Sequence, residues 1–87
     1  MYVIAIYDVA SERTGKMLKL CRRYLHWVQN SVFEGEITEV KLKELIVESE
    51  KIMDKSYDSF ILFKNRNANW LDKQVIGIEK SEVDQFL

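Results

Sequence analysis

The hydrophobic pattern of the chain begins with a strand. Residues 2–7 are apolar or aromatic (YVIAIY), and Asp8 follows them directly. The run is rich in β-branched and aromatic side chains and is too short for a helix. We therefore predict a buried strand from Tyr2 to Asp8 that ends in a carboxylate.

A helix is predicted next, from Glu12 to about Leu25. Ser11 is a suitable N-cap, because its hydroxyl can accept a hydrogen bond from a free backbone N–H of the next turn. The apolar side chains recur at the spacing of one helical face. They are Met17, Leu18, Cys21, Tyr24 and Leu25.

The pattern changes at His26 and stays extended in character as far as Ile37. This segment is predicted to be one bent strand or a tight pair of strands, with a bulge or bend at Ser31 or Gly35. Thr38 then caps a second helix with a clear apolar stripe. The stripe consists of Leu42, Leu45, Ile46, Ser49, Ile52 and Met53.

The last part of the chain holds two further strands. A polar link over 54–58 leads to Ser59–Lys64 (SFILFK), which is apolar on both faces. Gln74–Ile78 is predicted to be a last short strand. A polar tail with an apolar end follows over 79–87.

This order of elements predicts an α+β fold, the ferredoxin-like βαββαβ sandwich with an extra C-terminal strand. We expect one domain over 1–78, with 79–87 packing on a partner subunit. Both helices would cover one face of an antiparallel sheet. Because Ser59–Lys64 is apolar on both faces, a second copy is expected to cover the other face and form a homodimer.

Composition restricts the function classes. The 87 residues fit one small domain of net charge −1, so a nucleic-acid binder built from this chain must use a local patch. Residues 1–30 carry five basic residues against two acids, whereas residues 31–58 carry eight acids against four lysines. No apolar run approaches the ~18–20 residues that span a bilayer, and Cys21 is the only cysteine. We expect a cytoplasmic protein with no membrane contact.

Asp8 is the first candidate for chemistry. An Asx turn or a helix cap is one explanation for an acid at this position, and a metal ligand or general base is the other. One carboxylate is too few for a firm Mg²⁺ site, but a symmetric dimer supplies a second Asp8. Two carboxylates ~4 Å apart repel by about 4 kcal/mol at an effective dielectric near 20. A shared proton or a divalent cation relieves that repulsion. A metal ion, Mg²⁺ or Mn²⁺, could in addition polarise a phosphodiester.

The second candidate is a basic strip on the first predicted helix. Charge runs on helices are usually solvated surface, but few acids interrupt this one, and a dimer would present two such strips to phosphates. Its members are Arg13, Lys16, Lys19, Arg22 and Arg23. We interpret His26 as a surface or capping residue, Cys21 as buried, and Trp70 as a residue of dimer packing rather than base stacking.

Two motifs resemble the CRISPR-associated protein two family. The first is IYDV at 6–9, followed by SER at 11–13 and a basic helix, and the second is VQNSVFEG at 28–35. The resemblance extends over the whole chain and implies a ferredoxin-like homodimer. It also implies a Mg²⁺-dependent endonuclease acting on RNA or double-stranded DNA. Such proteins also serve spacer acquisition, where they bridge the integrase, CRISPR-associated protein one.

The resemblance assigns expected roles to particular residues. Asp8 matches the aspartate that binds the metal and carries catalysis, with Tyr7 before it. Arg13 matches the arginine of the strand-to-helix turn, and Ser31 and Phe33 are expected near the dimer centre. The segment 74–78 matches a C-terminal strand that pairs with the partner subunit.

Several functions remain open at this stage. The first is a metal-dependent endonuclease of CRISPR spacer acquisition and antiviral defence. The second is a non-catalytic structural adaptor that bridges integrase dimers on DNA. The third is a toxin-like ribonuclease of the virulence-associated type, and the fourth is a small-molecule sensor on the same fold, because a fold does not fix a function.

Overall fold

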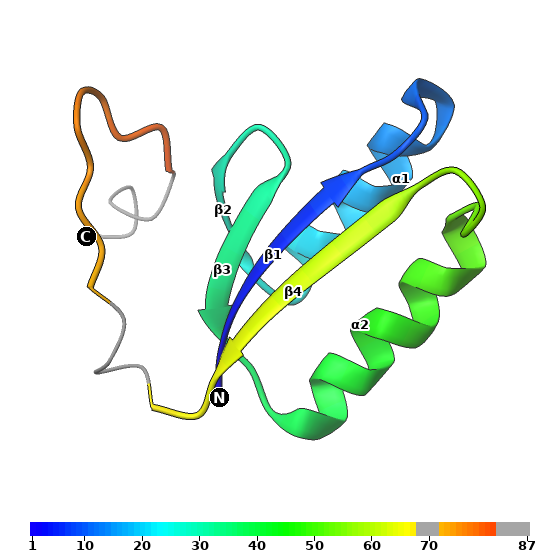
Figure 1. Ribbon diagram of the computed structural model, residues 1–87. Coiled ribbons are helices and arrows are strands. Elements are labelled where there is room, and N and C mark those ends of the chain that lie inside the picture. The colour runs from blue at the N-terminus through cyan, green and yellow to red at the C-terminus, as the bar shows by residue number, and fades with distance from the viewer. Residues whose placement is uncertain (68–71, 82–87) are drawn as a thin grey trace.

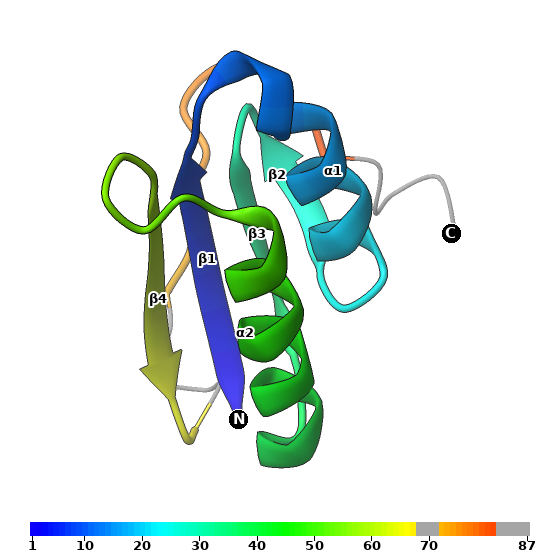
Figure 2. The same ribbon diagram turned by 90° about the vertical axis from the view of Figure 1, so that its right-hand side faces the viewer.

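Antiparallel pairing organises the chain into one sheet covered by helices. A computed structural model describes residues 1–67 and 72–81. These ranges contain β1 (Tyr2–Asp8), α1 (Ser11–Arg22), β2 (His26–Gln29), β3 (Val32–Glu36), α2 (Glu39–Ile52) and β4 (Ser59–Asn65). The strands follow the order β2-β3-β1-β4, and both helices lie on one face of the sheet (Figure 1, Figure 2). This is the predicted ferredoxin-like arrangement.

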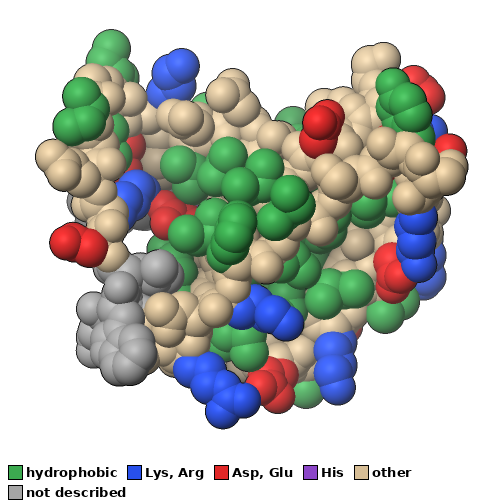
Figure 3. All heavy atoms as spheres, viewed as in Figure 1, with side chains coloured by type: hydrophobic (Ala, Val, Ile, Leu, Met, Phe, Trp, Pro, Cys, Tyr) green, Lys and Arg blue, Asp and Glu red, His purple; other side chains and the backbone are tan. Residues whose placement is uncertain are grey.

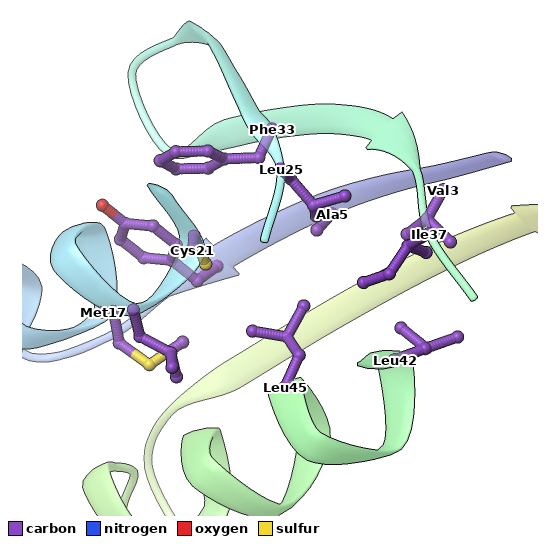
Figure 4. Packing of buried hydrophobic residues seen from close by; sticks show 11 residues of the cluster. Val3, Ala5, Met17, Cys21, Leu25, Phe33, Ile37, Leu42 and Leu45 are labelled. Carbon is purple, nitrogen blue, oxygen red and sulfur yellow. The ribbon is translucent and has the colours of Figure 1, made fainter. Parts of the chain in front are cut away.

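The core lies between the sheet and the two helices (Figure 4). Side chains alternate between the two faces along β1, and Val3, Ala5 and Tyr7 are the buried, helix-facing ones. Phe33 of β3 is 0% exposed, and its ring stacks on Tyr7 with 6.2 Å between ring centroids. The helices contribute the other side of this core through Met17, Leu20, Cys21, Leu42 and Leu45.

The ends of α1 differ from the prediction. Ala10 is the N-cap and supplies no side-chain hydrogen bond, so the prediction of Ser11 as the cap was wrong. The helix ends at Arg22, before Leu25. Leu25 is nonetheless buried, because the turn that follows the helix folds its side chain into the same core. Thr38 caps α2 as predicted, with its Oγ1 accepting from the Lys41 N–H at 3.1 Å.

The segment 26–37 contains a tight pair of strands, one of the two predicted alternatives. Its turn places Asn30 at φ 47°, a left-handed conformation that asparagine tolerates better than most residues. The predicted bend at Ser31 is present, because Ser31 belongs to the turn between the two strands. The register shift lies between Trp27 and Gln29 in β2, and Gly35 pairs regularly with Val3. The indole N–H of Trp27 donates to the Asn30 carbonyl at 3.0 Å and closes the turn.

The predicted strand at 74–78 is absent from the described residues 72–81, which contain no assigned strand. A strand requires a neighbouring backbone to pair with, and none of the strands in residues 1–67 pairs with this segment. Lys73 holds the segment near the sheet, because its Nζ lies 2.6 Å from Glu34 Oε2. Trp70 and residues 82–87 of the tail lie outside the described residues. Neither helix in the described ranges has the length and apolarity needed to cross a membrane.

Candidate functional site

Asp8 stands at the end of an interior strand with its side chain exposed. β1 lies between β3 and β4, and Asp8 pairs in register with Ser59, the first residue of β4. By the alternation along β1, its side chain belongs to the sheet face opposite the helices, which we call the open face. Among the described residues the Asp8 carboxylate takes part in no hydrogen bond or ion pair.

Asp58, and not Asp8, binds the free backbone N–H at the start of α1. The backbone N–H of Ala10, which opens α1, donates to Asp58 Oδ1 at 2.9 Å. Within the described chain Asp8 therefore forms neither the Asx turn nor the helix cap that its position allows. An exposed carboxylate that the fold does not use is available for chemistry.

Backbone segments flank Asp8 on both sides of β1. The Tyr7 N–H donates to the Ser31 carbonyl at 3.2 Å, which brings the turn between β2 and β3 beside the end of β1. Ser59 lies on the other side. Tyr7 and Phe33 are buried in the helix-facing core, and burial raises the pKa of Tyr7. Their role in the single chain is to stiffen the strands that carry Asp8 and Ser31. The expected place of Ser31 and Phe33 near a dimer centre stays a prediction.

Asp58 is a site residue that the sequence analysis placed in a polar link and otherwise missed. Its buried carboxylate forms a bidentate ion pair with Arg13, with 2.6 Å from Nε to Oδ2 and 3.1 Å from Nη2 to Oδ1. The guanidinium is the main reason that the pKa of Asp58 lies well below its usual range. The sequence places Asp58 directly before the strand Ser59–Lys64, and this position becomes informative once the strand order is known. β1 and β4 are antiparallel neighbours, so an acid before β4 must lie beside the end of β1.

The basic strip lies in the helical layer, whereas Asp8 belongs to the open face. Lys16, Lys19, Arg22 and Arg23 are exposed on α1 or at its end. Lys16 and Lys19 form no ion pair with any described residue. The Arg23 guanidinium lies over the Tyr24 ring, 5.7 Å from its centroid. Arg13 differs from the rest of the strip because its guanidinium is bound to Asp58.

Apolar side chains cover the middle of the open face, as Figure 3 shows from the same side as Figure 1. The register places Ile6 between Val32 and Ile61, and Ile4 opposite Phe63. Ile61 and Phe63 are 49% and 57% exposed. These five residues, Ile4, Ile6, Val32, Ile61 and Phe63, form what we call the open-face cluster. The cluster extends along β1 towards Asp8.

The chain alone offers few ligands for a metal ion. Within residues 1–67 and 72–81, no three His, Cys, Asp or Glu side chains converge on one point. Asp8 supplies one hard oxygen donor, which fits Mg²⁺ only where other ligands, such as water or a second copy of Asp8, complete the shell. His26 is exposed, as expected. Cys21 is buried, and burial raises the pKa of its thiol to about 12, so it stays protonated and is no nucleophile.

Comparisons with known proteins agree on one family. The model of the family "CRISPR associated protein Cas2" matches residues 1–73. The CRISPR-associated endoribonuclease Cas2 of Dictyoglomus turgidum is 46% identical over 87 residues, covering 100% of both chains. The CRISPR-associated endoribonuclease Cas2 3 of Thermodesulfovibrio yellowstonii is 49% identical over 86 residues, covering 99% of this chain and 98% of the relative. A crystal structure of Cas2 superposes with a TM-score of 0.84 at 41% identity, covering 92% of this chain and 90% of that one.

Proposed function

This chain belongs to the Cas2 family of CRISPR-associated proteins, and from that premise we propose that it is a metal-dependent endonuclease that hydrolyses phosphodiester bonds. RNA is the first substrate to test, because the relatives are named endoribonucleases. Double-stranded DNA is the second. The observation that carries the proposal is Asp8, an exposed carboxylate at the end of an interior strand that forms no bond with any described residue.

The metal ligand would be Asp8 in two copies. One carboxylate per chain is consistent with Mg²⁺, which commonly keeps several waters and takes one or two protein carboxylates. A divalent cation at that position would stabilise charge on the phosphodiester and lower the pKa of a bound water. Lys16 and Lys19 would hold phosphates of the substrate, since their ammonium groups are free of ion pairs with described residues.

A homodimer would bring the two Asp8 side chains together. The open-face cluster leaves apolar side chains in water, and a second copy of the same surface would cover it about a two-fold axis. Ile76 and Ile78 support this arrangement, because they are 85% and 82% exposed in a segment without a strand partner. Pairing of the segment 74–78 with the partner subunit would use both its backbone and these side chains.

The test compares Asp8→Asn with the wild-type protein and with Asp72→Asn. Asp72 is an exposed acid outside the site, so its variant controls for the loss of one surface charge. Each protein is purified in parallel and incubated with labelled RNA and with duplex DNA across a titration of Mg²⁺ and Mn²⁺. We expect metal-stimulated cleavage by the wild type and by Asp72→Asn, and none by Asp8→Asn. Full cleavage by Asp8→Asn would remove Asp8 from the mechanism and overturn the proposal.

A second candidate function is a structural adaptor in spacer acquisition. The specific observation in its favour is that the basic strip lies in the helical layer, so DNA bound along α1 need not reach Asp8. The dimer would then space two copies of the integrase, CRISPR-associated protein one, along a DNA segment. This role and the nuclease role can coexist in one protein.

A spacer-acquisition assay in cells separates the adaptor from the nuclease. If the adaptor role holds, Asp8→Asn acquires spacers at the wild-type rate, and a chain lacking residues 79–87 loses co-purification with the integrase. Loss of acquisition in Asp8→Asn, with the complex intact, would assign the acquisition role to the nuclease site. A complex unaffected by the truncation would show that the tail does not dock the integrase.

A further inference from the structure

The carboxylate of Asp58 connects the two loops that adjoin Asp8. Its side chain is 0% exposed and lies where the turn after α2 enters β4. Besides the two bonds from Arg13, its Oδ1 accepts from the Ala10 N–H at 2.9 Å and its Oδ2 from the Asp54 N–H at 2.9 Å. Each oxygen thus accepts two hydrogen bonds, which exhausts the acceptor capacity of a carboxylate. Asp58 has no lone pair left for a metal ion.

These bonds fix the backbone on both sides of Asp8. Ala10 is two residues after Asp8, in the connection that leaves β1. Ser59 directly follows Asp58 and is the residue with which Asp8 pairs in register. One buried carboxylate therefore determines both the direction of the chain after Asp8 and the position of the strand beside it.

Arg13 is committed to this arrangement. Its Nε and Nη2 bind Asp58, and its Nη1 lies 3.3 Å from Glu12 Oε1. The Arg13 side chain is only 22% exposed. A phosphate could bind this guanidinium only by breaking the bidentate pair and leaving the Asp58 carboxylate buried without its counter-charge, which is strongly unfavourable. Lys16, one turn further along α1, is exposed and has no such commitment.

Resting on the proposed nuclease function, we propose that Arg13 and Asp58 are positioning residues for Asp8, and that Arg13 does not contact the nucleic acid. The pair holds the end of β1 against the start of β4, so that the Asp8 carboxylate is presented in one place. Small misplacements of a reacting group cost large factors in rate, and a site at the end of a strand depends on the elements that anchor that end. This inference replaces the phosphate-binding role that membership of the basic strip predicted for Arg13.

The test uses Arg13→Gln, Asp58→Asn and the double variant, each of which removes the ion pair. Lys16→Gln is the matched control, because it deletes one cation from the same helix without touching Asp58. Three measurements are made on each protein. They are kcat and KM for RNA cleavage as a function of salt, Mn²⁺ binding to the protein without RNA by electron paramagnetic resonance, and amide hydrogen exchange at Val9 and Ala10.

The two single variants are expected to behave alike. Each lowers kcat by about 10- to 100-fold and weakens Mn²⁺ binding, as changes to residues that support a ligand do, while KM and its salt dependence stay the same. Exchange at Val9 and Ala10 speeds up in both. The double variant matches either single variant, because all three lose the same interaction. Lys16→Gln gives the opposite pattern, a raised KM with unchanged kcat and Mn²⁺ binding.

Three results would overturn the inference. The first is Arg13→Gln raising KM and reducing the salt dependence while Asp58→Asn does neither, because Arg13 would then be a phosphate contact. The second is that both single variants fold, by circular dichroism, and keep wild-type kcat and Mn²⁺ binding while Asp8→Asn is inactive. The third is wild-type cleavage that Asp8→Asn retains in full, which overturns the nuclease proposal and this inference with it.

A conservative variant covers the case in which loss of the pair prevents folding. Arg13→Lys keeps the charge but cannot form the bidentate contact. If it folds, the inference predicts a kcat below that of the wild type with unchanged KM. A wild-type kcat and wild-type Mn²⁺ binding in Arg13→Lys would show that the geometry of the pair is irrelevant to the site.

Discussion

Asp8 pairs in register with Ser59, and this places it one residue from Asp58, the most strongly hydrogen-bonded acid in the described chain. Two aspartates at the same end of the sheet thus differ in burial and in hydrogen bonding. The Asp58 carboxylate is buried and accepts four hydrogen bonds, whereas the Asp8 carboxylate is exposed and forms no hydrogen bond or ion pair with a described residue. Asp58 therefore has a structural role, and the Asp8 carboxylate is available to bind a ligand.

The pH dependence of the free energy of unfolding should report the ionisation of Asp58. Arg13, followed by the backbone N–H groups of Asp54 and Ala10, keeps the pKa of Asp58 below its ordinary value of 3.8 in the folded state. The unfolded chain therefore binds the proton first, and the stabilisation is complete above about pH 4 and is lost as the pH falls towards the folded pKa. We expect the melting temperature of the wild type to exceed that of Asp58→Asn at about pH 6 and the difference to shrink at about pH 2.5.

Thermal denaturation followed by circular dichroism at several pH values measures this difference. Asp72→Asn serves as the control, since it removes an exposed acid from outside the pair. A difference between wild type and Asp58→Asn that stays constant across the acid range would contradict the assignment.

The stability of the core should depend on Phe33. This ring is 0% exposed and stacks on Tyr7, so Phe33→Ala leaves a cavity beneath the strand that carries Asp8. Substitutions of this kind cost about 3–5 kcal/mol in the free energy of unfolding. Urea denaturation measures the loss. The control is Val40→Ala, at a residue of α2 that is 70% exposed, and it is expected within about 0.5 kcal/mol of the wild type. Equal effects of the two changes would show that Phe33 is not a core residue.

The open-face cluster should control assembly. Ile61→Lys places a charge in the middle of the surface proposed to pair with a second copy, and desolvating an unpaired charge there is costly. We expect a monomer of Ile61→Lys and a dimer of the wild type by size-exclusion chromatography with light scattering. Val47→Lys is the matched control, because Val47 of α2 is 50% exposed and Ile61 is 49% exposed. A wild-type monomer, or a dimer of Ile61→Lys, would rule out this interface.

The basic strip should set the salt dependence of nucleic-acid binding. Replacing Lys16, Lys19 and Arg23 by Gln removes three exposed cations from α1 and its end. If each contacts one phosphate of single-stranded RNA, the slope of log K against log salt falls in magnitude by about 2. Fluorescence anisotropy with labelled RNA measures the slope. The same change at Lys43, Lys51 and Lys55 of the α2 region should leave it unaltered, and equal effects of the two triple variants would argue for net charge rather than a site.

The first strand was readable in the sequence because a short run of β-branched and aromatic residues is typical of a buried strand. The apolar run over 2–7 and the order of helices and strands follow from short-range patterns. The capping of α2 by Thr38 is local in the same sense. Only the fold shows that Val3 and Ala5 lie on the buried face of β1. The predicted end of the first helix near Leu25 was wrong, because α1 ends at Arg22 and Leu25 packs into the core from the turn that follows.

The segment 74–78 shows where sequence pattern is insufficient for a strand. Its composition suits extended chain, yet its backbone has no partner strand among the described residues. Hydrogen bonds of a strand are made with another segment, so a local pattern gives only the capacity to form one. Whether a partner subunit supplies the second strand stays a prediction.

The sequence predicted the ferredoxin-like order of elements and the carboxylate at the end of β1, because both follow from residues close together in the chain. Only the tertiary structure decided which acid is free. Arg13 and Asp58 lie 45 residues apart, and β1 and β4 must pair before they can meet. Their contact depends on chain topology and on the cost of burying an unpaired charge, and neither can be read from local periodicity.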